Sequence, residues 1–311
     1  MSYDQGDGRS QLFGLGGQGR RYSNGIKLLP IIIGVVALVV FYFSHKQEGP
    51  FGRSQLVGMN SQEEMALGAQ SFREVLKQSD VIREGPVVES VQRLARQLTA
   101  ASQQKDVLEF TQLKPVNFEW ETRVVRSREV NAFCLPGGKI VVYTGILPVA
   151  ETESCLAAVM GHEISHALCH HGAERMAQNK MVQIGQMAAA GAAGDMDPQR
   201  QQQILGVLGA GAKLGFLLPF SREHESEADH IGLILMAAAG HDPKKAVVFW
   251  QRMQKASKGG KPSEFMSTHP SDERRISDLE GLQEEAMQFY NRAPQKQQDR
   301  KLPIGMWDRG F

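Results

Sequence analysis

Residues 162–166 read HEISH, in which two histidines flank a glutamate at the spacing of one helical turn. On a helix His162 and His166 project from one face, so their two imidazoles can bind one Zn²⁺. Glu163 is not expected to bind the metal. In an HExxH arrangement it is the general base that takes a proton from the attacking water. The motif therefore predicts hydrolysis at a zinc ion, one per chain.

The residues around the motif favour the helix that this chemistry needs. Residues 155–177 contain no proline, and apolar residues recur at helical spacing. These apolar residues are Leu156, Val159, Met160, Ile164 and Leu168. We therefore expect a helix over 155–177.

Two histidines leave the site incomplete, because a catalytic zinc usually has three protein ligands and keeps its fourth position for water. His170 lies about 12 Å along the helix from His162, which is too far to share one ion. The segment SREHESEADHIG at 221–232 can form a second helix. There Glu225 and Asp229 share a face, so one carboxylate can bind the metal while the other accepts the free ring N–H of a ligand histidine.

Four stretches extend this pattern. They are GHEISH at 161–166 with HGAERM at 171–176, ESEAD at 225–229, VNAFCLPGGKIVVYTGIL at 130–147 and STHPSDERRI at 267–276. Together they resemble the M48 family of zinc metalloendopeptidases, in the branch that includes Oma-type mitochondrial proteases and bacterial envelope quality-control proteases. The resemblance covers about 60–285.

The resemblance assigns roles to five residues. It implies that His162, His166 and Glu225 bind zinc, that Glu163 is the catalytic base, and that Asp229 orients a ligand histidine. It also implies a gluzincin-like fold and polypeptide substrates that are unfolded or damaged envelope proteins. Alternative donors near the third ligand are His224, Glu227 and His230.

The stretch LPGGKIVVYTG at 135–145 joins a Pro-Gly-Gly turn to a short β-branched and aromatic run, which predicts a strand. At a sheet edge such a strand can pair with an extended peptide, and the resemblance implies an edge strand here. The alternative is an ordinary core strand. The residues expected to contact substrate are Gly138, Ile140, Val141, Val142 and Tyr143.

His269 precedes Pro270, so we expect an extended or turn conformation just before a helix that begins near Ser271. A lone histidine is usually structural. The resemblance implies a loop near the metal, where His269 either stabilises the oxyanion or temporarily occupies the open zinc position.

Residues 28–44 carry no charge and would span about 26 Å as a helix, close to the bilayer core of about 30 Å. The alternatives, a buried core helix and a cleaved signal peptide, fit less well, because no amphipathic alternation and no small-residue cleavage pattern are present. Basic residues are more numerous before the span than after it. The N-terminus is therefore expected in the cytoplasm and the peptidase on the far side, facing a bacterial periplasm rather than a mitochondrial compartment.

The expected organisation is a disordered tail (1–27), a transmembrane anchor (28–44), a linker (45–59), an M48-like zinc peptidase domain (60–290) and a solvated C-terminal tail (291–311). The fold class is mostly helical α+β with a small mixed β-sheet. We expect a first helix with a capping box from Ser61 to Glu64, a second helix over about 86–98 and a strand at 116–120. The Ala/Gly-rich residues 185–219 form either two packed helices, or a mobile lid or membrane-resting surface.

Other function classes find little support. A net charge of +1 gives no reason to expect nucleic acid. The GLGGQG at 14–19 lacks the strand and βαβ unit of a nucleotide site. Three cysteines without CxxC spacing favour buried thiols over disulfides. Two alternatives to a peptidase are a chaperone-like binding protein with a latent or structural zinc site, and a zinc hydrolase of non-peptide substrates.

Overall fold

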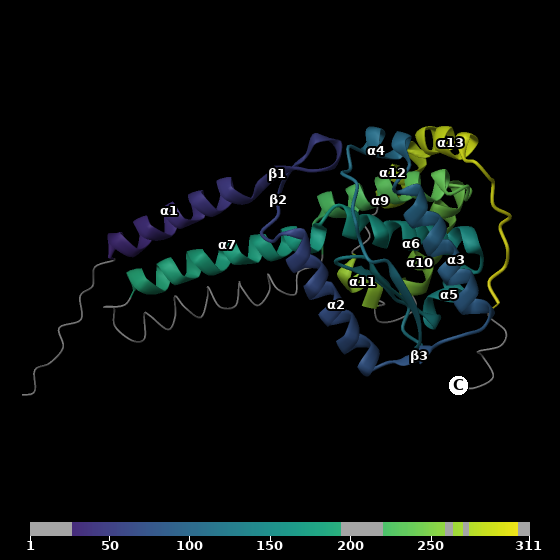
Figure 1. Cartoon of the computed structure of the whole chain (residues 1–311), viewed down its shortest axis with the longest axis horizontal. Helices are drawn as coiled ribbons and strands as arrows, with labels where there is room; N and C mark the ends of the chain where they lie inside the picture. The colour runs from purple at the N-terminus through teal and green to yellow at the C-terminus, as the bar shows by residue number, and fades with distance from the viewer. Residues whose placement is uncertain (1–26, 194–219, 259–263, 270–273, 304–311) are drawn as a thin grey trace, which may run out of the picture.

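The structure, a computed structural model, describes residues 27–193, 220–258, 264–269 and 274–303. It consists of a body, in which helices surround a small sheet, and an arm of two long helices that projects from the body (Figure 1). Most of the expected N-terminal tail, the second part of the Ala/Gly-rich segment and the last residues of the chain lie outside the described ranges.

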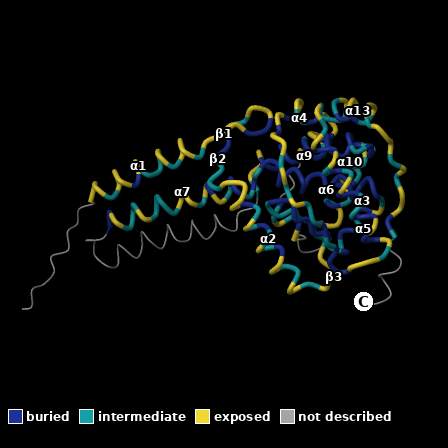
Figure 2. Tube along the Cα trace, viewed as in Figure 1, coloured by how far each residue is buried: buried dark blue, intermediate teal, exposed yellow. Residues whose placement is uncertain are grey.

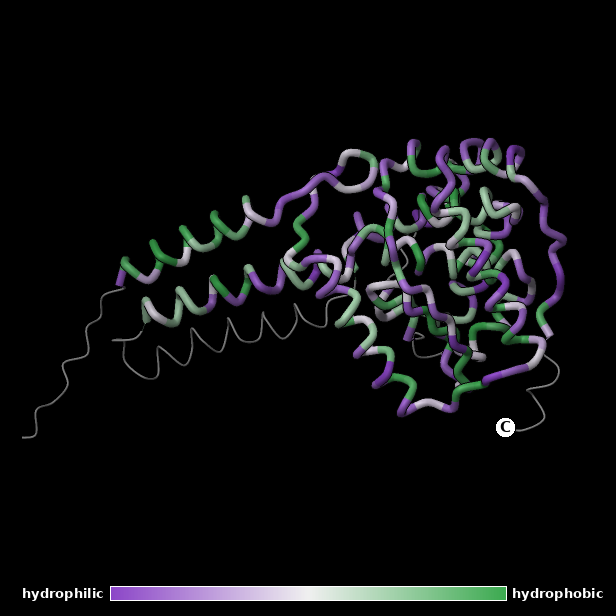
Figure 3. The backbone as a smooth tube through the Cα atoms, viewed as in Figure 1, coloured by the Kyte–Doolittle hydropathy of each residue, from purple (hydrophilic) through white to green (hydrophobic). Residues whose placement is uncertain are grey.

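The arm contains α1 (Leu28–His45) and α7 (His171–Ala192), which lie side by side. Helix α1 is the expected membrane segment, and among the described residues it is the helix long and apolar enough to cross a bilayer, with a mean hydropathy of 2.3. Its apolar side chains are largely exposed, as Figures 2 and 3 show together. Exposure of this kind indicates an apolar environment outside the protein.

A short hairpin joins the arm to the body. Strand β1 (Lys46–Glu48) pairs antiparallel with β2 (Ser54–Leu56), and the 3₁₀ turn η1 (Pro50–Gly52) lies between them. Arg53 follows this turn, so the hairpin carries its guanidinium from the anchor towards the body.

Helix α2 (Ser61–Lys77) begins with a capping box one residue earlier than expected. The Asn60 side chain accepts the N–H of Gln62 and of Glu63, and the Glu63 carboxylate accepts the Asn60 N–H. The predicted box from Ser61 to Glu64 is therefore wrong. Asparagine is itself a strong cap, and Glu64 is buried instead.

The sheet is small and mixed, as predicted. Its strands are β3 (Asp80–Ile82), β4 (Glu121–Arg126), β6 (Lys139–Tyr143) and β5 (Ala132–Leu135), in that spatial order. The β4–β6 pair is parallel, and the other two pairs are antiparallel. The strand expected at 116–120 is not formed, because that stretch is unpaired and pairing begins at Glu121.

The predicted substrate strand exists, but its expected position at the sheet edge is wrong. Strand β6 pairs with β4 on one side and with β5 on the other, and Ile140, Val141 and Val142 are buried. A continuous apolar run without polar alternation is typical of a strand covered on both faces. The edge strand next to it is β5, which packs beside α6 (Glu153–Leu168).

The core lies where α3 (Pro86–Ala101), α6, α9 (Arg222–Ala238) and α10 (Lys244–Lys258) meet beneath the sheet. Every residue of α6 is buried. Helices α6 and α9 cross in close contact, because a Cβ added to Gly161 would lie 2.8 Å from the Gly232 carbonyl oxygen. This contact brings the acidic segment of α9 to the histidines of α6.

The other helices of the described residues are α4 (Lys105–Thr111), η2 (Thr144–Ile146), α5 (Leu147–Ala150), α11 (Glu264–Thr268), α12 (Arg275–Gly281) and α13 (Gln283–Arg292).

The helix expected over 155–177 is broken. Helix α6 ends at Leu168, His170 takes a left-handed φ of 56°, and α7 starts at His171 in the direction of the arm. A left-handed non-glycine residue costs about 1–2 kcal/mol. The 2.7 Å contact between His170 Nδ1 and the buried Glu64 carboxylate helps to offset that cost. His170 therefore fixes the break and stays away from the metal candidates.

The C-terminal segment 293–303 is exposed or half-buried at every position except Leu302, as expected for a solvated tail, but it is bonded to the body. Leu302 is buried and its N–H donates to the Glu151 carbonyl, while the Gln297 N–H donates to the Gly240 carbonyl. Lys301 pairs with Thr152. These bonds hold the segment along the body, because backbone groups placed against a protein surface need partners.

Candidate active site

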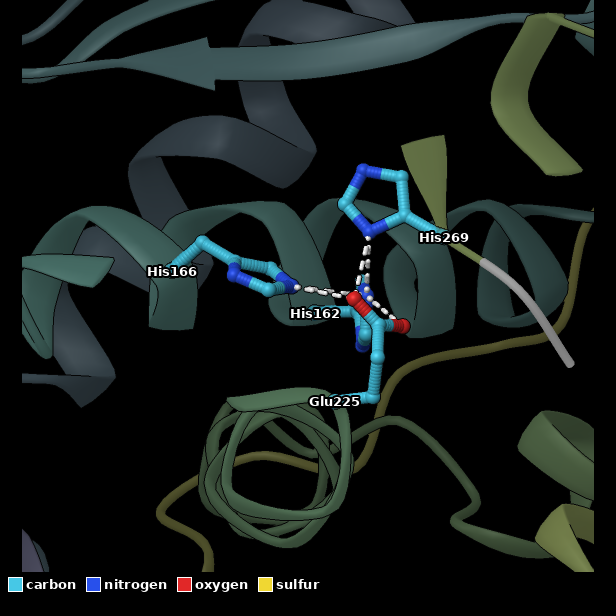
Figure 4. A group of neighbouring side chains, drawn as sticks. All are labelled: His162, His166, Glu225 and His269. Carbon is cyan, nitrogen blue, oxygen red and sulfur yellow. Dashed lines mark hydrogen bonds and ion pairs between the residues drawn. The ribbon is translucent and has the colours of Figure 1, made fainter. Parts of the chain in front are cut away.

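His162 and His166 project from α6 and turn the Nε2 atoms of their imidazoles towards each other, 3.1 Å apart (Figure 4). Both residues are buried. Glu225 approaches from α9, which Figure 4 shows end-on below α6. Its carboxylate oxygens lie 3.5 Å from His162 Nε2 and 3.4 Å from His166 Nε2.

His269, which follows α11, completes a group of four possible metal ligands. Its Nδ1 lies 3.3 Å from His162 Nε2 and 2.9 Å from the Glu225 carboxylate. Tetrahedral zinc with bonds of about 2.0–2.1 Å separates its ligand atoms by roughly 3.3 Å. The donor atoms here are separated by 2.9 to 3.5 Å, a range that includes this value, so these residues fit Zn²⁺. The residues around Ser271, where the next helix was expected, lie outside the described ranges, and α12 begins at Arg275.

Glu225 is ionised, as a ligand must be. Burial alone would raise the pKa of its carboxyl, but the surrounding imidazoles of His162, His166 and His269 hold that pKa far below its ordinary value. A buried anion at the convergence of three imidazoles is a favourable place for a divalent cation.

Glu163 lies next to this group and is also buried. Burial raises the pKa of its carboxyl to about 7, partly opposed by nearby His269 and by a hydrogen bond from the Cys134 backbone. Among the described residues, Glu163 Oε1 has no hydrogen-bond partner, although His269 Nε2 lies 3.5 Å away. A carboxyl with a pKa near neutrality and one unpaired oxygen is suited to accepting and returning a proton.

His162 is oriented by Asp229, which lies on the face of α9 that we call the metal side (Glu225, Asp229), and by Arg275 of α12. Asp229 Oδ1 lies 2.8 Å from His162 Nδ1, so this nitrogen donates its hydrogen and the lone pair of Nε2 is left to face the other candidate ligands. Arg275 donates to both Asp229 and Glu225 and stacks 3.3 Å above the Trp250 ring. The guanidinium thereby fixes both carboxylates.

His166 is oriented from the opposite face of α9, which we call the anchor side (Glu227 with His171 and Arg53). His166 Nδ1 lies 2.9 Å from His171 Nδ1, and His171 Nε2 lies 2.8 Å from Glu227. Burial lowers the pKa of His171 to about 4, so His171 is neutral and can accept at one nitrogen while it donates at the other. This chain of bonds fixes the tautomer in which the lone pair of His166 Nε2 faces the other candidate ligands.

Arg53 ends this chain of bonds. Its guanidinium donates to both oxygens of Glu227, at 3.0 and 3.1 Å, and to both oxygens of Glu174, at 3.0 and 2.9 Å. His224 Nε2 lies 3.1 Å from Glu174. Glu227 and His224 therefore lie in this network rather than at the metal. His230, the remaining alternative donor, contacts Glu285.

Cys169, His171 and Glu227 form a second group with the spacing of possible metal ligands. Arg53 already bonds both oxygens of Glu227, and burial raises the pKa of the Cys169 thiol, so the thiol stays protonated. A protonated thiol is a poor metal ligand. We therefore interpret this group as part of the hydrogen-bond network.

Sequence reasoning missed Arg275, His171 and Arg53. The first two lie inside motifs quoted above, STHPSDERRI at 267–276 and HGAERM at 171–176, but their partners come from distant parts of the chain. Arg53 follows the membrane segment and had no local signal beyond its charge. The predicted substrate residues Ile140, Val141 and Val142 are buried within the sheet, one strand away from its edge.

Comparison with known proteins places these residues in context. Residues 91–283 match the model of peptidase family M48. The chain is 36% identical over 248 residues to the mitochondrial metalloendopeptidase OMA1 of Schizosaccharomyces pombe, covering 78% of this chain and 67% of the relative. It is 31% identical over 260 residues to human metalloendopeptidase OMA1, covering 81% of this chain and 48% of the relative.

A bacterial relative is also similar. The beta-barrel assembly-enhancing protease of Escherichia coli is 31% identical over 161 residues, which cover 50% of this chain and 32% of the relative. The chain thus spans about half of the human protein and a third of the bacterial one.

Proposed function

Because the chain belongs to peptidase family M48, we propose that it is a membrane-anchored zinc endopeptidase in which His162, His166 and Glu225 bind the metal. The observation that carries this proposal is the convergence of these donors at the ligand spacing of tetrahedral zinc, with Glu163 beside them. Asp229 supports His162 in this assignment.

Bound zinc supplies a Lewis acid that polarises the scissile carbonyl and makes water more acidic. Glu163 takes the proton of the attacking water on its unpaired Oε1 and later returns a proton to the leaving amine. The raised pKa of Glu163 suits both steps. Asp229 and the His171 chain hold the two histidines in the tautomers that the site requires.

For the substrate we propose pairing with β5 in place of the earlier β6 assignment. Strand β5 pairs with β6 on one side only, and the Cys134 N–H points to Glu163, away from β6. The other edge of β5 therefore faces the catalytic carboxylate. An extended polypeptide added there would lie along α6 with a peptide bond near the metal donors. Unfolded proteins of the compartment that the body faces offer such segments.

His269 has two possible roles in this proposal. Its Nδ1 lies among the metal donors, so in this conformation it would occupy the position that substrate and water need. Its Nε2 lies 3.5 Å from Glu163 Oε1, so a turn of the ring away from the metal donors would place it beside the catalytic carboxylate, where it would bond a developing oxyanion. The position of His269 among the metal donors also favours one alternative function, a binding protein in which His269 permanently blocks the metal site.

The anchor and the organisation of the chain follow the same proposal. Residues 28–45 cross the membrane, residues 60–290 form the peptidase domain, and the basic residues before the anchor keep the N-terminus in the cytoplasm. A bacterial inner membrane with the body in the periplasm fits this charge distribution.

The full-length protein with Glu163→Gln tests the function. The amide cannot accept a proton, whereas every proposed metal ligand is retained, so zinc content should stay at one per chain while casein cleavage is lost. Wild type with and without a chelator is the control. Cleavage by the variant near the wild-type rate would rule out Glu163 as the base. Chelator-resistant cleavage would contradict a zinc-dependent mechanism, and no cleavage by zinc-loaded wild type would favour the binding protein or the hydrolase of non-peptide substrates.

A further inference from the structure

Helix α7 lies antiparallel against the anchor α1 along most of the arm (Figure 1). The two helices meet through small residues. A Cβ added to Gly34 would lie 2.3 Å from Ala188 Cβ, and one added to Gly191 would lie 3.0 Å from Pro30. The last turns of α7 therefore lie level with the first turns of α1.

A backbone hydrogen bond gives independent evidence for this alignment of the two helices. At the tip of the arm, the Lys27 N–H donates to the Ala192 carbonyl at 3.1 Å. Lys27 directly precedes the anchor, so α7 reaches the end of α1 that is farther from the body. If α1 enters the membrane, α7 must therefore enter it too. Otherwise the contact between the two helices would have to break.

The part of α7 that lies level with residues 28–41 of α1 is free of charge. Lys180 is the last charged residue of the helix, and residues 181–193 contain no Asp, Glu, Lys or Arg. As a helix this run is about 20 Å long. Val182 and Met187 lie on it with 46% and 63% of their surface exposed. Large apolar side chains exposed beside an exposed apolar helix indicate a lipid-facing surface.

The packing between the two helices suits a bilayer. Helices satisfy their own backbone groups, and close contacts through glycine and alanine are the usual way in which helices associate in lipid. Gln183 and Gln186 are the amide side chains of the run. Amides are tolerated in membrane helices where they bond to neighbouring groups.

We propose that residues 181–193 of α7 enter the hydrocarbon core of the membrane beside α1. The body is then held by two helices, and the second of them continues from the zinc-binding motif after the break at His170. This proposal goes beyond peptide hydrolysis. It requires that α1 crosses the membrane, but it does not require that the site is active.

The test uses the full-length protein in vesicles, with an environment-sensitive fluorophore on one introduced cysteine. Met187→Cys reports the proposed segment, and Val36→Cys, on the exposed face of α1, reports the anchor. Gln178→Cys is the matched control, because it is exposed on the same helix on the body side of Lys180. Labelled wild type gives the background from Cys134, Cys155 and Cys169.

Lipids that carry a nitroxide on the acyl chain should quench the probes at Met187 and Val36 to a similar extent and leave the probe at Gln178 bright. Quenching at Val36 without quenching at Met187 would overturn the proposal, because α7 would then lie outside the bilayer. Quenching at neither position would overturn it too, by removing the anchor. Casein cleavage in the same vesicles is a separate readout, so its absence beside the expected quenching would count against the proposed function alone.

Discussion

The two sides of α9 both carry buried carboxylates paired with an arginine, but they differ in the groups that surround those carboxylates. On the metal side Glu225 and Asp229 pair with Arg275, and on the anchor side Glu227 pairs with Arg53. All three carboxylates are buried and all are bonded by an arginine. Only the metal side also faces several imidazole nitrogens that converge on one point. Burial and charge pairing therefore do not distinguish a candidate metal ligand, whereas the convergence of several imidazole nitrogens supports the proposed assignment of Glu225.

The largest expected effect separates the two sides directly. Glu225→Ala should remove most of the bound zinc from the purified protein, because a ligand is lost. Glu227→Ala should retain most of it, since two residues along a helix point about 200° apart and Glu227 faces Arg53. Metal analysis after dialysis measures both. Equal losses in the two variants would remove the distinction between the sides.

The second prediction concerns what the anchor side does contribute. Arg53→Met should destabilise the protein by about 3–5 kcal/mol, because it leaves two buried carboxylates without their cation. The control is Arg123→Met, which breaks a partly exposed pair with Glu121 and should cost less than about 1 kcal/mol. Urea unfolding of both variants in detergent measures the difference. Similar midpoints for the two variants would show that the anchor side is not a stabilising network.

The pH dependence of stability provides a third test. Burial would raise the pKa of Glu174, but hydrogen bonds from His224 and Arg53 lower it from 4.5 to about 2. A lowered folded-state pKa gives stability that is complete above about pH 4.5 and is lost as the pH falls towards 2. This pKa difference corresponds to on the order of 3 kcal/mol in the free energy of unfolding.

Unfolding of the metal-free protein between pH 7 and pH 3 should therefore show falling stability, and Arg53→Met should flatten that fall. Using the metal-free protein excludes the pH dependence of zinc binding. An equally steep fall in the variant would mean that other carboxyls are responsible.

The smallest effect compares the groups that hold the two histidines. Asp229→Ala should weaken zinc binding about 10–100-fold, the range typical for groups that orient a ligand. His171→Ala should weaken it less than Asp229→Ala does, because a neutral imidazole polarises His166 less than a carboxylate polarises His162. Competition with a fluorescent zinc chelator gives both affinities. The reverse order would mean that the anchor side controls the metal.

The parts of the site that were predictable are those set by local spacing. His162 and His166 are one turn apart, as are Glu225 and Asp229, and the rule of helical faces places each pair without knowledge of the fold. The mostly helical class and the small mixed sheet also followed from sequence patterns and the resemblance.

The misplaced capping box is a local error of one residue, whereas the errors that affect the site depend on partners far away in sequence. Whether β6 is an edge strand depends on where β5 pairs, and the break at His170 depends on Glu64, 106 residues earlier in the chain. Arg53 meets Glu227 across 174 residues. No periodicity within a window of one helix or strand contains such information.

The break at His170 also has a geometric consequence for substrates. From His171, which touches a proposed zinc ligand, to Lys180, where α7 loses its charges, the helix rises only about 14 Å. If α7 enters the bilayer after Lys180, as proposed, the helical segment from His171 to Lys180 sets the distance between the site and the lipid. An extended chain needs about four residues to cover that height. A neighbour in the same membrane would then be cut only where its unfolded segment outgrows this minimum reach, so tether length, and not only sequence, would select what is cleaved.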